Sequence, residues 1–259
     1  MKKIVVFLPT LNECANLQWL LPRFEQASLP QFTLLVVDDD SRDGTRDFLN
    51  SYKSHSFDLR LIVRRGDPGR GLAGQVAFAF AHKTGADVLV EMDADGSHDP
   101  CDVASLMDGL GPGVGMVLGC RKNFLDKKGE QCHVFRKMMT IVSNAFVRRL
   151  FNVPYRDGNS GFRCYSRDAI DRLVRISLKA RGCEIVHETL FKARRSGIRI
   201  AERPIEFYAR RSGVTTKKFH DFVRVFAVCL LLKAGLWDRF CVFGRSVGGG
   251  ALEENPSSV

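Results

Sequence analysis

The chain has 259 residues, enough for one large α/β domain or two small ones, and its hydrophobic share of 45% is that of a globular protein with a full core. Its formal net charge of +10 favours an anionic partner, such as phosphate, nucleic acid or an anionic membrane surface. Its eight cysteines are scattered without a CxxC pair, which argues against a zinc site or a disulfide framework and fits reduced thiols in a cytosolic protein.

The N-terminal residues show no pattern of a targeting segment. Lys2 and Lys3 precede only a short apolar segment, Ile4 to Leu8, with no small-residue cleavage site. Runs of about 18 apolar residues, the minimum for a spanning helix, do not occur in the sequence. We therefore expect neither a secretory signal nor a membrane-spanning helix.

The first half of the sequence alternates short apolar segments with helical ones. Strands are predicted at residues 3–8, 33–37, 59–63 and 88–92, and helices at 14–27, after Ser41 or Asp43, and after the glycine-rich loop 65–74. This alternation predicts an α/β fold with a mostly parallel central sheet. The carboxyl ends of parallel strands share one edge, so the polar loops that follow these strands should meet there. The glycine-rich loop contains G-x-G-x-x-G at residues 69–74, but it follows the third predicted strand and not the first, which argues against a dinucleotide site. The loop is either a close-packed helix start or a phosphate contact.

The second half of the sequence is less regular. We expect a strand at 114–118, a short strand within 155–165, and a short strand pair at 199–207. Helices are expected at about 134–151, 167–177 and 184–196. With no internal repeat or dividing linker, residues 1–240 are predicted to form a single domain. Residues 241–259 carry Gly, Ser and acidic residues without a core pattern, and we expect a disordered tail there.

Two aspartates directly follow the apolar strand at 88–92. Asp93 and Asp95 are separated by one small residue and followed by Gly96, so both carboxylates should point into one crevice at the edge of the sheet. Their mutual repulsion makes a hard divalent cation their natural partner. The alternative is a solvated acidic turn that opens a helix, with Asp99 as its N-cap.

The order of the polar loops resembles that of glycosyltransferase family 2, which implies the GT-A (Rossmann-like) nucleotide-sugar-binding fold. Within the family, the resemblance is closest to the dolichol- or polyprenol-phosphate mannosyltransferases. The matching segments are FLPTLNECANL (7–17), VVDDDSRDGT (36–45), GRGLAG (69–74), EMDADGSHDP (91–100), GCRK (119–122), RDGNSGFRCY (156–165), HETLFKARRSGIRIAERPIEF (187–207) and ARRSG (209–213).

On the donor side, the resemblance implies a nucleotide pocket lined by Pro9, Thr10, Glu13 and Asp39, with Asp39 near the base or ribose. The alternative for residues 38–40 is helix capping plus solvated charge.

Further along the chain, Asp93 and Asp95 correspond to the metal-binding DXD pair. They would hold Mg²⁺ or Mn²⁺ against the donor diphosphate, so Asp95 is also counted as catalytic. Ser97 is a weaker candidate ligand for the metal.

On the acceptor side, Arg121 and Arg136 resemble residues that grip a lipid phosphate, for which the guanidinium group is well suited. The resemblance also assigns site roles to Asp157, Ser160, Glu188, Arg210 and Lys217. Three departures from the family pattern affect the site. They are the Asp-Gly-Asn-Ser-Gly sequence at 157–161, Gly96 after the acidic pair, and one extra residue before Lys217.

The resemblance implies a metal-dependent inverting glycosyltransferase that moves mannose from GDP-mannose to a polyprenyl or dolichyl phosphate. A phosphate monoester is already anionic near neutral pH and attacks without a base, so Arg121 would have a catalytic role by aiming it. If the acceptor is instead another glycan, lipid or small hydroxyl compound, with a UDP-sugar as donor, a base is needed, and Asp157 and Glu188 are the candidates.

Two further alternatives remain open, a sugar-phosphate nucleotidyltransferase and a basic module that binds nucleic acid. Acidic residues at the predicted binding edge argue against a nucleic-acid partner. The segment 216–240 mixes basic with apolar and aromatic residues, which suits either an interfacial helix or a core-packing one. We therefore expect a cytoplasmic protein, with peripheral contact at the cytoplasmic face of a membrane if the helix is interfacial.

Overall fold

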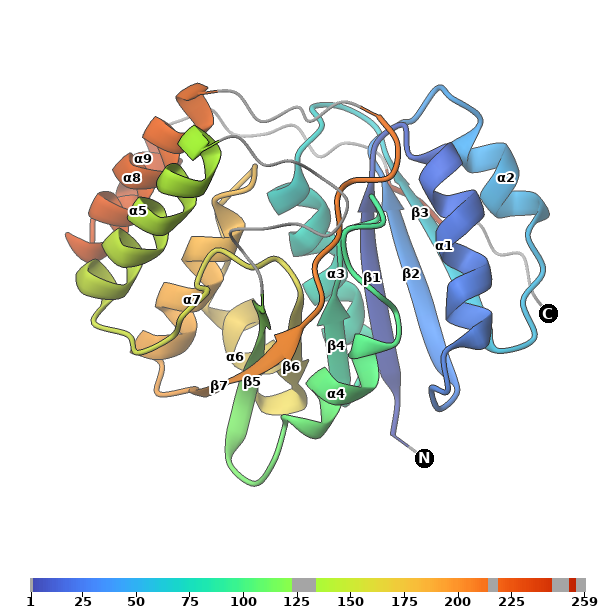
Figure 1. Cartoon of the computed structure of the whole chain (residues 1–259), viewed down its shortest axis with the longest axis horizontal. Coiled ribbons are helices and arrows are strands. Elements are labelled where there is room, and N and C mark those ends of the chain that lie inside the picture. Colours follow the sequence, from blue (N-terminus) through green and yellow to red (C-terminus); the bar gives the residue numbers. More distant parts are fainter. Residues whose placement is uncertain (1, 123–133, 214–218, 244–251, 255–259) are drawn as a thin grey trace.

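The structure is a computed structural model that describes residues 2–122, 134–213, 219–243 and 252–254. For residues 134–137, 219–222, 242–243 and 252–254 it describes the backbone only. The strands of this part of the chain form one sheet in the order β7-β5-β6-β4-β1-β2-β3-β8, with helices on both faces (Figure 1).

Four parallel strands form the central part of the sheet, as the alternating sequence predicts. They are β1 (Ile4–Thr10), β2 (Phe32–Asp38), β3 (Phe57–Arg64) and β4 (Val88–Glu91). In their register, Thr10 lies beside Asp38, and Asp38 lies beside Val63. β1, β2 and β3 end almost level with one another, and β4 ends earlier, where Glu91 pairs with Phe7. Because all four strands run parallel, the polar loops that follow them lie along one edge of the sheet. The expected meeting of these loops is confirmed.

The sheet continues through strands from the second half of the chain. β6 (Arg163–Ser166) runs antiparallel between β4 and β5 (Val114–Arg121), and β7 (Arg199–Ile205) runs parallel to β5. The expected strand pair at 199–207 is therefore wrong, because these residues form one strand that pairs with β5 instead of folding back on itself. The prediction of a disordered tail is wrong for β8 (Leu252–Glu254), which pairs antiparallel with β3.

Alternate side chains of each central strand enter two separate cores, as the period of a strand requires. Val6 and Leu8 of β1 face one core, and Val5 and Phe7 face the other. The first core lies under α1 (Cys14–Gln26), α2 (Thr45–Ser51) and α4 (Asp102–Asp108). The second lies under α3 (Arg70–Thr84), α5 (Val134–Phe151), α6 (Arg167–Ile176), α7 (Ile185–Arg195), α8 (Phe219–Lys233) and α9 (Trp237–Phe243).

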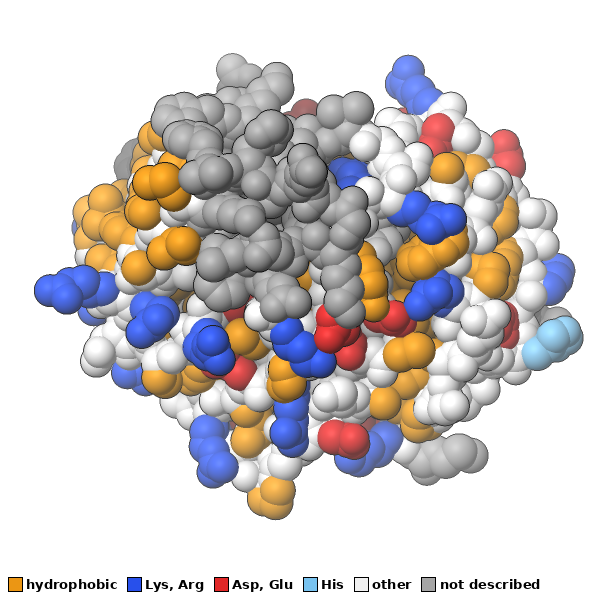
Figure 2. Space-filling model, in the orientation of Figure 1, with side chains coloured by type: hydrophobic (Ala, Val, Ile, Leu, Met, Phe, Trp, Pro, Cys, Tyr) orange, Lys and Arg blue, Asp and Glu red, His pale blue; other side chains and the backbone are white. Residues whose placement is uncertain are grey.

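The helices α5, α8 and α9 lie together at one end of the molecule (Figure 1). One face of α8 packs into the core through Val228, Cys229 and Leu232. Its other side exposes Val223 and Leu230, and hydrophobic side chains gather over this end of the surface (Figure 2). Across residues 2–122, 134–213 and 219–243, none of the helices combines the length and the apolar character needed to cross a bilayer.

Candidate active site

Side-chain hydrogen bonds join the loops that follow β1 and β2. Asp38 is fully buried and accepts hydrogen bonds from Thr10 Oγ1 at 3.0 Å and from Ser41 Oγ at 2.5 Å. Asp43 Oδ2 accepts a hydrogen bond from the Cys14 N–H at 2.9 Å, at the start of α1. The alternative of helix capping plus solvated charge for residues 38–40 does not describe Asp38, which is buried and caps neither α1 nor α2. Asp38 instead joins the end of β1 to the loop after β2.

Asp39 faces the glycine-rich loop instead. Its Oδ2 accepts a hydrogen bond from the Gly69 N–H at 2.6 Å, and its other oxygen pairs with Arg64. Burial raises the pKa of the Asp39 carboxyl, although these two contacts oppose the shift. Asp39 is thus an acidic acceptor at the edge of the sheet, as expected for a residue that would bind base or ribose groups.

Glu13 and Arg210 come from opposite ends of the chain and form an ion pair. Arg210 also donates to the Ser212 carbonyl at 2.9 Å, and Asn16 donates to the second oxygen of Glu13. Burial raises the pKa of Glu13, while Asn16 and Arg210 act against the shift. Pro9 lies half-buried at the end of β1 nearby in sequence. The structure therefore brings two of the predicted substrate-binding residues into direct contact.

The acidic pair lies just past β4. Asp93 keeps 35% of its side chain exposed, and Asp95 is half-buried. The Ser97 N–H donates to Asp95 Oδ1 at 3.0 Å, while Ser97 itself is buried. Gly96 between them has φ 77°, in the left-handed region that favours glycine, which explains the departure from the family pattern at this position.

The segment after β7 lies across this acidic turn. Backbone N–H groups of Tyr208 and Arg211 donate to the carbonyls of Ser97 and Asp95, at 3.0 and 3.1 Å. The Arg211 guanidinium lies 4.8 Å from the centroid of the Trp19 ring, beside Gly96. This segment therefore links the late basic residues to the predicted metal site.

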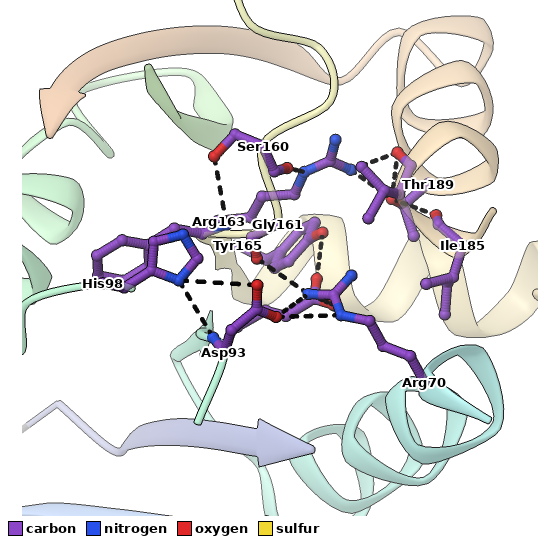
Figure 3. Close-up of polar contacts among 12 residues, drawn as sticks. Arg70, Asp93, His98, Ser160, Gly161, Arg163, Tyr165, Ile185 and Thr189 are labelled. Atoms are coloured by element: carbon purple, nitrogen blue, oxygen red, sulfur yellow. Dashed lines mark hydrogen bonds and ion pairs between the residues drawn. The ribbon is translucent and has the colours of Figure 1, made fainter. Parts of the chain in front are cut away.

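Sequence reasoning missed a buried basic and acidic pair beside Asp93. Arg70 Nη2 lies 3.0 Å from Asp93 Oδ1 and 3.2 Å from Glu91 Oε1 (Figure 3). The Tyr165 hydroxyl donates to the second oxygen of Glu91 at 3.2 Å. Burial alone would lower the pKa of Arg70, but the carboxylates of Asp93 and Glu91 raise it above its ordinary value. An acidic residue in the otherwise apolar strand at 88–92 was the signal that could have drawn attention to this pair.

His98 lies against the same turn and was also missed. Its Nδ1 accepts a hydrogen bond from the Asp93 N–H at 3.3 Å (Figure 3). Its ring packs on Phe162 and Phe207. Burial lowers the pKa of His98, with the neighbouring carboxylates opposing the shift. The imidazole therefore supports the backbone of the acidic turn.

Arg121 and Asp157 form a bidentate ion pair on the acceptor side. Arg121 Nε and Nη2 lie 2.5 and 2.6 Å from the two oxygens of Asp157, which is fully buried. Burial alone would lower the pKa of Arg121, but Asp157 raises it. The guanidinium also lies 5.0 Å from the centroid of the Phe207 ring. Asp157 therefore fixes the orientation of the arginine that was predicted to grip a phosphate.

The turn that follows Asp157 is held by a buried arginine. Arg163 donates to the carbonyls of Gly158 and Ser160 at 2.8 Å each, and to Thr189 Oγ1 of α7 at 2.7 Å (Figure 3). Ser160 is buried within this turn. Arg163 thus joins the turn that carries Asp157 and Ser160 to helix α7, a role that sequence reasoning did not assign.

Glu188 is fully buried on α7 and is surrounded by donors. It accepts hydrogen bonds from the N–H groups of Lys179 and Ala180 and from Trp237 Nε1, and it pairs with Lys192 at 2.8 Å. Among the contacts in the described part of the chain, none joins Glu188 to another predicted site residue. Its catalytic assignment stays a prediction, and its contacts are those of a residue that organises the loop at 178–182.

That loop, in turn, meets the glycine-rich loop. The N–H groups of Gly71 and Leu72 donate to the Arg181 carbonyl at 3.0 and 3.2 Å. A Cβ atom on Gly71 would lie 2.3 Å from the Ala180 carbonyl oxygen. Of the two alternatives for this loop, the close-packed helix start is therefore the one that these contacts match.

The acidic turn fits a hard cation that takes few protein ligands. Mg²⁺ commonly binds through one or two carboxylates together with water and substrate phosphates, and Asp93 and Asp95 supply such a pair. In the described residues, no group of three or more His, Cys, Asp or Glu side chains could hold a metal by itself. The donor set therefore suits a metal shared with a phosphate ligand more than a closed protein cage.

Two predicted residues cannot be placed in the site. The side chain of Arg136 and all of Lys217 lie outside the described residues.

Comparisons with known proteins agree with this architecture. The sequence model described as Glycosyl transferase family 2 matches residues 5–174. Polyprenol monophosphomannose synthase of Mycolicibacterium smegmatis is 30% identical over 216 residues, which cover 83% of this chain and 80% of that protein. Undecaprenyl-phosphate mannosyltransferase of Micrococcus luteus is 30% identical over 211 residues, covering 82% and 86%.

Solved structures show the same fold. Glucosyl-3-phosphoglycerate synthase of Mycobacterium tuberculosis, in complex with Mn²⁺, UDP and its product, has a TM-score of 0.67 at 20% identity. The match covers 91% of this chain and 81% of that one. The expected GT-A fold is confirmed by this likeness, which at so low an identity concerns the fold alone.

Proposed function

The chain belongs to glycosyl transferase family 2, and we propose that it is a metal-dependent inverting enzyme that moves mannose from GDP-mannose to a polyprenyl phosphate. The observation that carries this proposal is the similarity, over more than four-fifths of the chain, to relatives named for mannose transfer to polyprenyl phosphates.

For the donor half of the site, the proposal assigns Pro9, Thr10, Glu13 and Asp39 to the nucleotide. Asp39 is an acidic acceptor near the glycine-rich loop, where it suits base N–H or ribose hydroxyl groups. Asp93 and Asp95, assisted by Ser97, would hold Mg²⁺ or Mn²⁺, which supplies charge neutralisation at the departing diphosphate. Arg210, already beside Glu13, and Lys217 are assigned to the same diphosphate.

On the acceptor side, the state of the two candidate bases supports a phosphate acceptor. Asp157 and Glu188 are each fully buried, and each is paired with a cationic side chain, Arg121 and Lys192 respectively. A carboxylate held in this way is poorly placed to act as a general base, because its oxygens already accept hydrogen bonds from protein donors and it is shielded from solvent. A phosphate monoester needs no base, since it is anionic near neutral pH.

Catalysis would then depend on orientation and charge. Asp157 holds Arg121 through two short hydrogen bonds, so the guanidinium is prearranged to aim the attacking phosphate. Arg136 and Ser160 are assigned to the same acceptor. A single displacement by this phosphate inverts the configuration at the anomeric carbon, and an enzyme-bound covalent sugar would contradict it.

The reaction is tested by incubating the protein with Mn²⁺, a short-chain polyprenyl phosphate and a panel of GDP- and UDP-sugars. We expect mannosyl phosphoprenol and GDP, identified by mass spectrometry, and no product after chelation. Asp95→Ala should abolish transfer while its thermal unfolding temperature stays close to that of the wild type, because Asp95 lies half-buried at the surface of the turn. Transfer by Asp95→Ala in the presence of chelator would overturn the metal assignment. Release of pyrophosphate would indicate a nucleotidyltransferase instead.

The proposal also places the protein on the cytoplasmic face of a membrane, where such an acceptor would be anchored. The apolar helix surface consists of exposed side chains of α5, α8, α9 and the α8–α9 turn, namely Met138, Ile141, Val142, Val223, Leu230, Leu236 and Phe240. The same helices expose the basic residues Arg148, Arg149, Lys233 and Arg239. Apolar side chains combined with basic ones suit the interface of an anionic bilayer.

Liposome flotation tests this attachment. The wild-type protein should float with anionic vesicles and less with neutral ones, and the double variant Leu230→Glu/Phe240→Glu should remain at the bottom of the gradient. The matched control is Ile176→Glu on α6, where another exposed apolar side chain lies outside the apolar helix surface. Equal flotation of all three proteins would refute the attachment without affecting the proposed reaction.

A further inference from the structure

Arg70 has a position that the proposed reaction does not explain. It is the first residue of α3, and its side chain extends to the acidic turn after β4 (Figure 3). Its Nε and Nη2 lie 3.2 and 3.0 Å from the same oxygen of Asp93, and Nη2 also lies 3.2 Å from Glu91 Oε1. One guanidinium thus pairs with two carboxylates, those of Glu91 and Asp93, and Asp93 is a predicted metal ligand.

The surrounding backbone keeps this guanidinium in place. The start of α3 is fixed by hydrogen bonds from Gly71 and Leu72 to the Arg181 carbonyl. On the opposite side, Arg70 Nη2 donates to the Gly161 carbonyl at 3.4 Å. A Cβ atom at Gly161 would lie 2.6 Å from Nη2, so the absence of a side chain there leaves room for the guanidinium. Arg70 is therefore built into the site.

The two carboxylates differ in their access to solvent. The side chain of Glu91 is 4% exposed, whereas that of Asp93 is 35% exposed. A buried carboxylate requires a permanent counter-ion, and Arg70 supplies it to Glu91 together with a hydrogen bond from the Tyr165 hydroxyl. Asp93 is the carboxylate that a cation from solution can reach, and Arg70 competes with that cation for it.

We propose that Arg70 is a resident counter-ion of Asp93, which it releases to an incoming divalent cation while it keeps its pairing with Glu91. Without a donor nucleotide, Asp93 and Asp95 would then bind a free cation weakly, and they would hold one firmly only together with a nucleotide diphosphate, whose oxygens add further ligands. This inference rests on the metal site of the proposed function. In this role, Arg70 is a positioning residue that makes firm binding of the metal depend on the bound donor nucleotide.

The experiment measures Mn²⁺ binding to the purified protein by the electron paramagnetic resonance signal of free Mn²⁺, with and without GDP. The main variant is Arg70→Gln/Glu91→Gln, which removes both charges, leaves no buried charge unpaired and keeps the net charge of the protein. Without GDP, we expect it to bind Mn²⁺ on the order of tenfold more tightly than the wild type, because the positive charge that is removed contacts Asp93 itself, whereas the negative charge that is removed contacts Arg70. The gain in Mn²⁺ affinity caused by GDP should shrink correspondingly.

Two single variants distinguish the effect of the contact between Arg70 and Asp93 from the effect of the overall charge of the protein on Mn²⁺ binding. Glu91→Gln removes one of the two carboxylates that pair with Arg70, so the guanidinium pairs with Asp93 alone. Mn²⁺ should then bind more weakly without GDP. Arg23→Gln removes one positive charge from a residue paired with Asp99 instead, and its Mn²⁺ affinity should stay within about twofold of the wild type.

The outcomes are distinguishable from those of the proposed function. If the wild type binds Mn²⁺ with GDP and the double variant gains nothing without GDP, the role of Arg70 is refuted and the metal site stands. If Arg23→Gln tightens binding as much as the double variant does, the contact with Asp93 is not the cause, and the inference fails. If the wild type binds no Mn²⁺ with either GDP or UDP, the metal site itself is wrong.

Discussion

The ion pair of Arg121 and Asp157 leads to a prediction that separates a positioning role from a catalytic one. Asp157→Asn keeps the shape of the fully buried side chain but leaves the guanidinium of Arg121, which is 15% exposed, without its counter-charge. Removing one partner of a buried ion pair costs about 3–5 kcal/mol. At about 2 °C per kcal/mol for a chain of this size, the unfolding temperature should fall by roughly 6–10 °C.

The double variant Arg121→Gln/Asp157→Asn should recover much of that loss, because it leaves neither charge uncompensated. The transfer activity of this double variant tests the positioning role of Asp157 more directly than its stability does. Removal of an aimed charged donor costs about 100- to 1000-fold in kcat, so Arg121→Gln alone should lose about that much. If Asp157 acts only by holding Arg121, the double variant should be no less active than Arg121→Gln.

The assays are calorimetric unfolding and steady-state transfer from GDP-mannose to a short-chain polyprenyl phosphate, on all four members of the cycle. A base contributes about 100-fold or more by itself. A double variant with that much less activity than Arg121→Gln would refute the positioning role and favour a hydroxyl acceptor. An Asp157→Asn protein as stable as the wild type would refute the energetic importance of the pair.

Three further predictions concern the framework of the site. Glu188→Gln should lower the unfolding free energy by about 1–3 kcal/mol, because the buried Lys192 loses its buried carboxylate partner and keeps only the more exposed Asp238; an unchanged denaturant midpoint would contradict this. Gly71→Ala should lose about 1–3 kcal/mol because its new Cβ meets a backbone carbonyl, whereas Gly111→Ala, which meets open space, should be nearly neutral in the same assay. Asp43→Ala should lose about 1–2 kcal/mol at pH 7, since Asp43 accepts backbone hydrogen bonds at the starts of two helices. Burial would raise the pKa of Asp43, but these hydrogen bonds lower it below its ordinary 3.8, so its stabilisation is complete above that pH and is lost as the pH falls through the lowered pKa. The difference between Asp43→Ala and the wild type should therefore shrink in acid, and a deficit that grows there would refute this linkage.

The parallel part of the sheet was predictable because its signals are local. Each of the four central strands is a short apolar segment followed directly by a polar loop, and parallel pairing places those loops together without knowledge of any distance. Asp39, Asp93 and Asp95 were selected as candidate site residues in this way, and their roles stay predictions. Asp38 and Asp39 look alike in the sequence, and only their contacts distinguish them: Asp38 binds Thr10 at the end of β1, whereas Asp39 binds the glycine-rich loop at Gly69.

The partners of charged residues were not predictable. Arg70 and Glu91 lie on different elements, and the sequence gives no sign that one guanidinium reaches both Glu91 and Asp93. Glu188 matches a family motif, yet its observed partners come from the loop at 178–182 and from Trp237, far along the chain. Pairings of this kind depend on how helices pack on the sheet, which periodicity does not specify.

The short strand β8 has a consequence for handling the protein. Without it, β3 would border the sheet with unpaired backbone N–H and C=O groups along its outer side, a surface that readily recruits strands from other molecules. β8 therefore covers the end of β3, residues 62–64, and limits pairing with strands of other molecules there. Truncation before Leu252 should leave the residues of the proposed active site unchanged, yet make the protein aggregate more readily as its concentration rises.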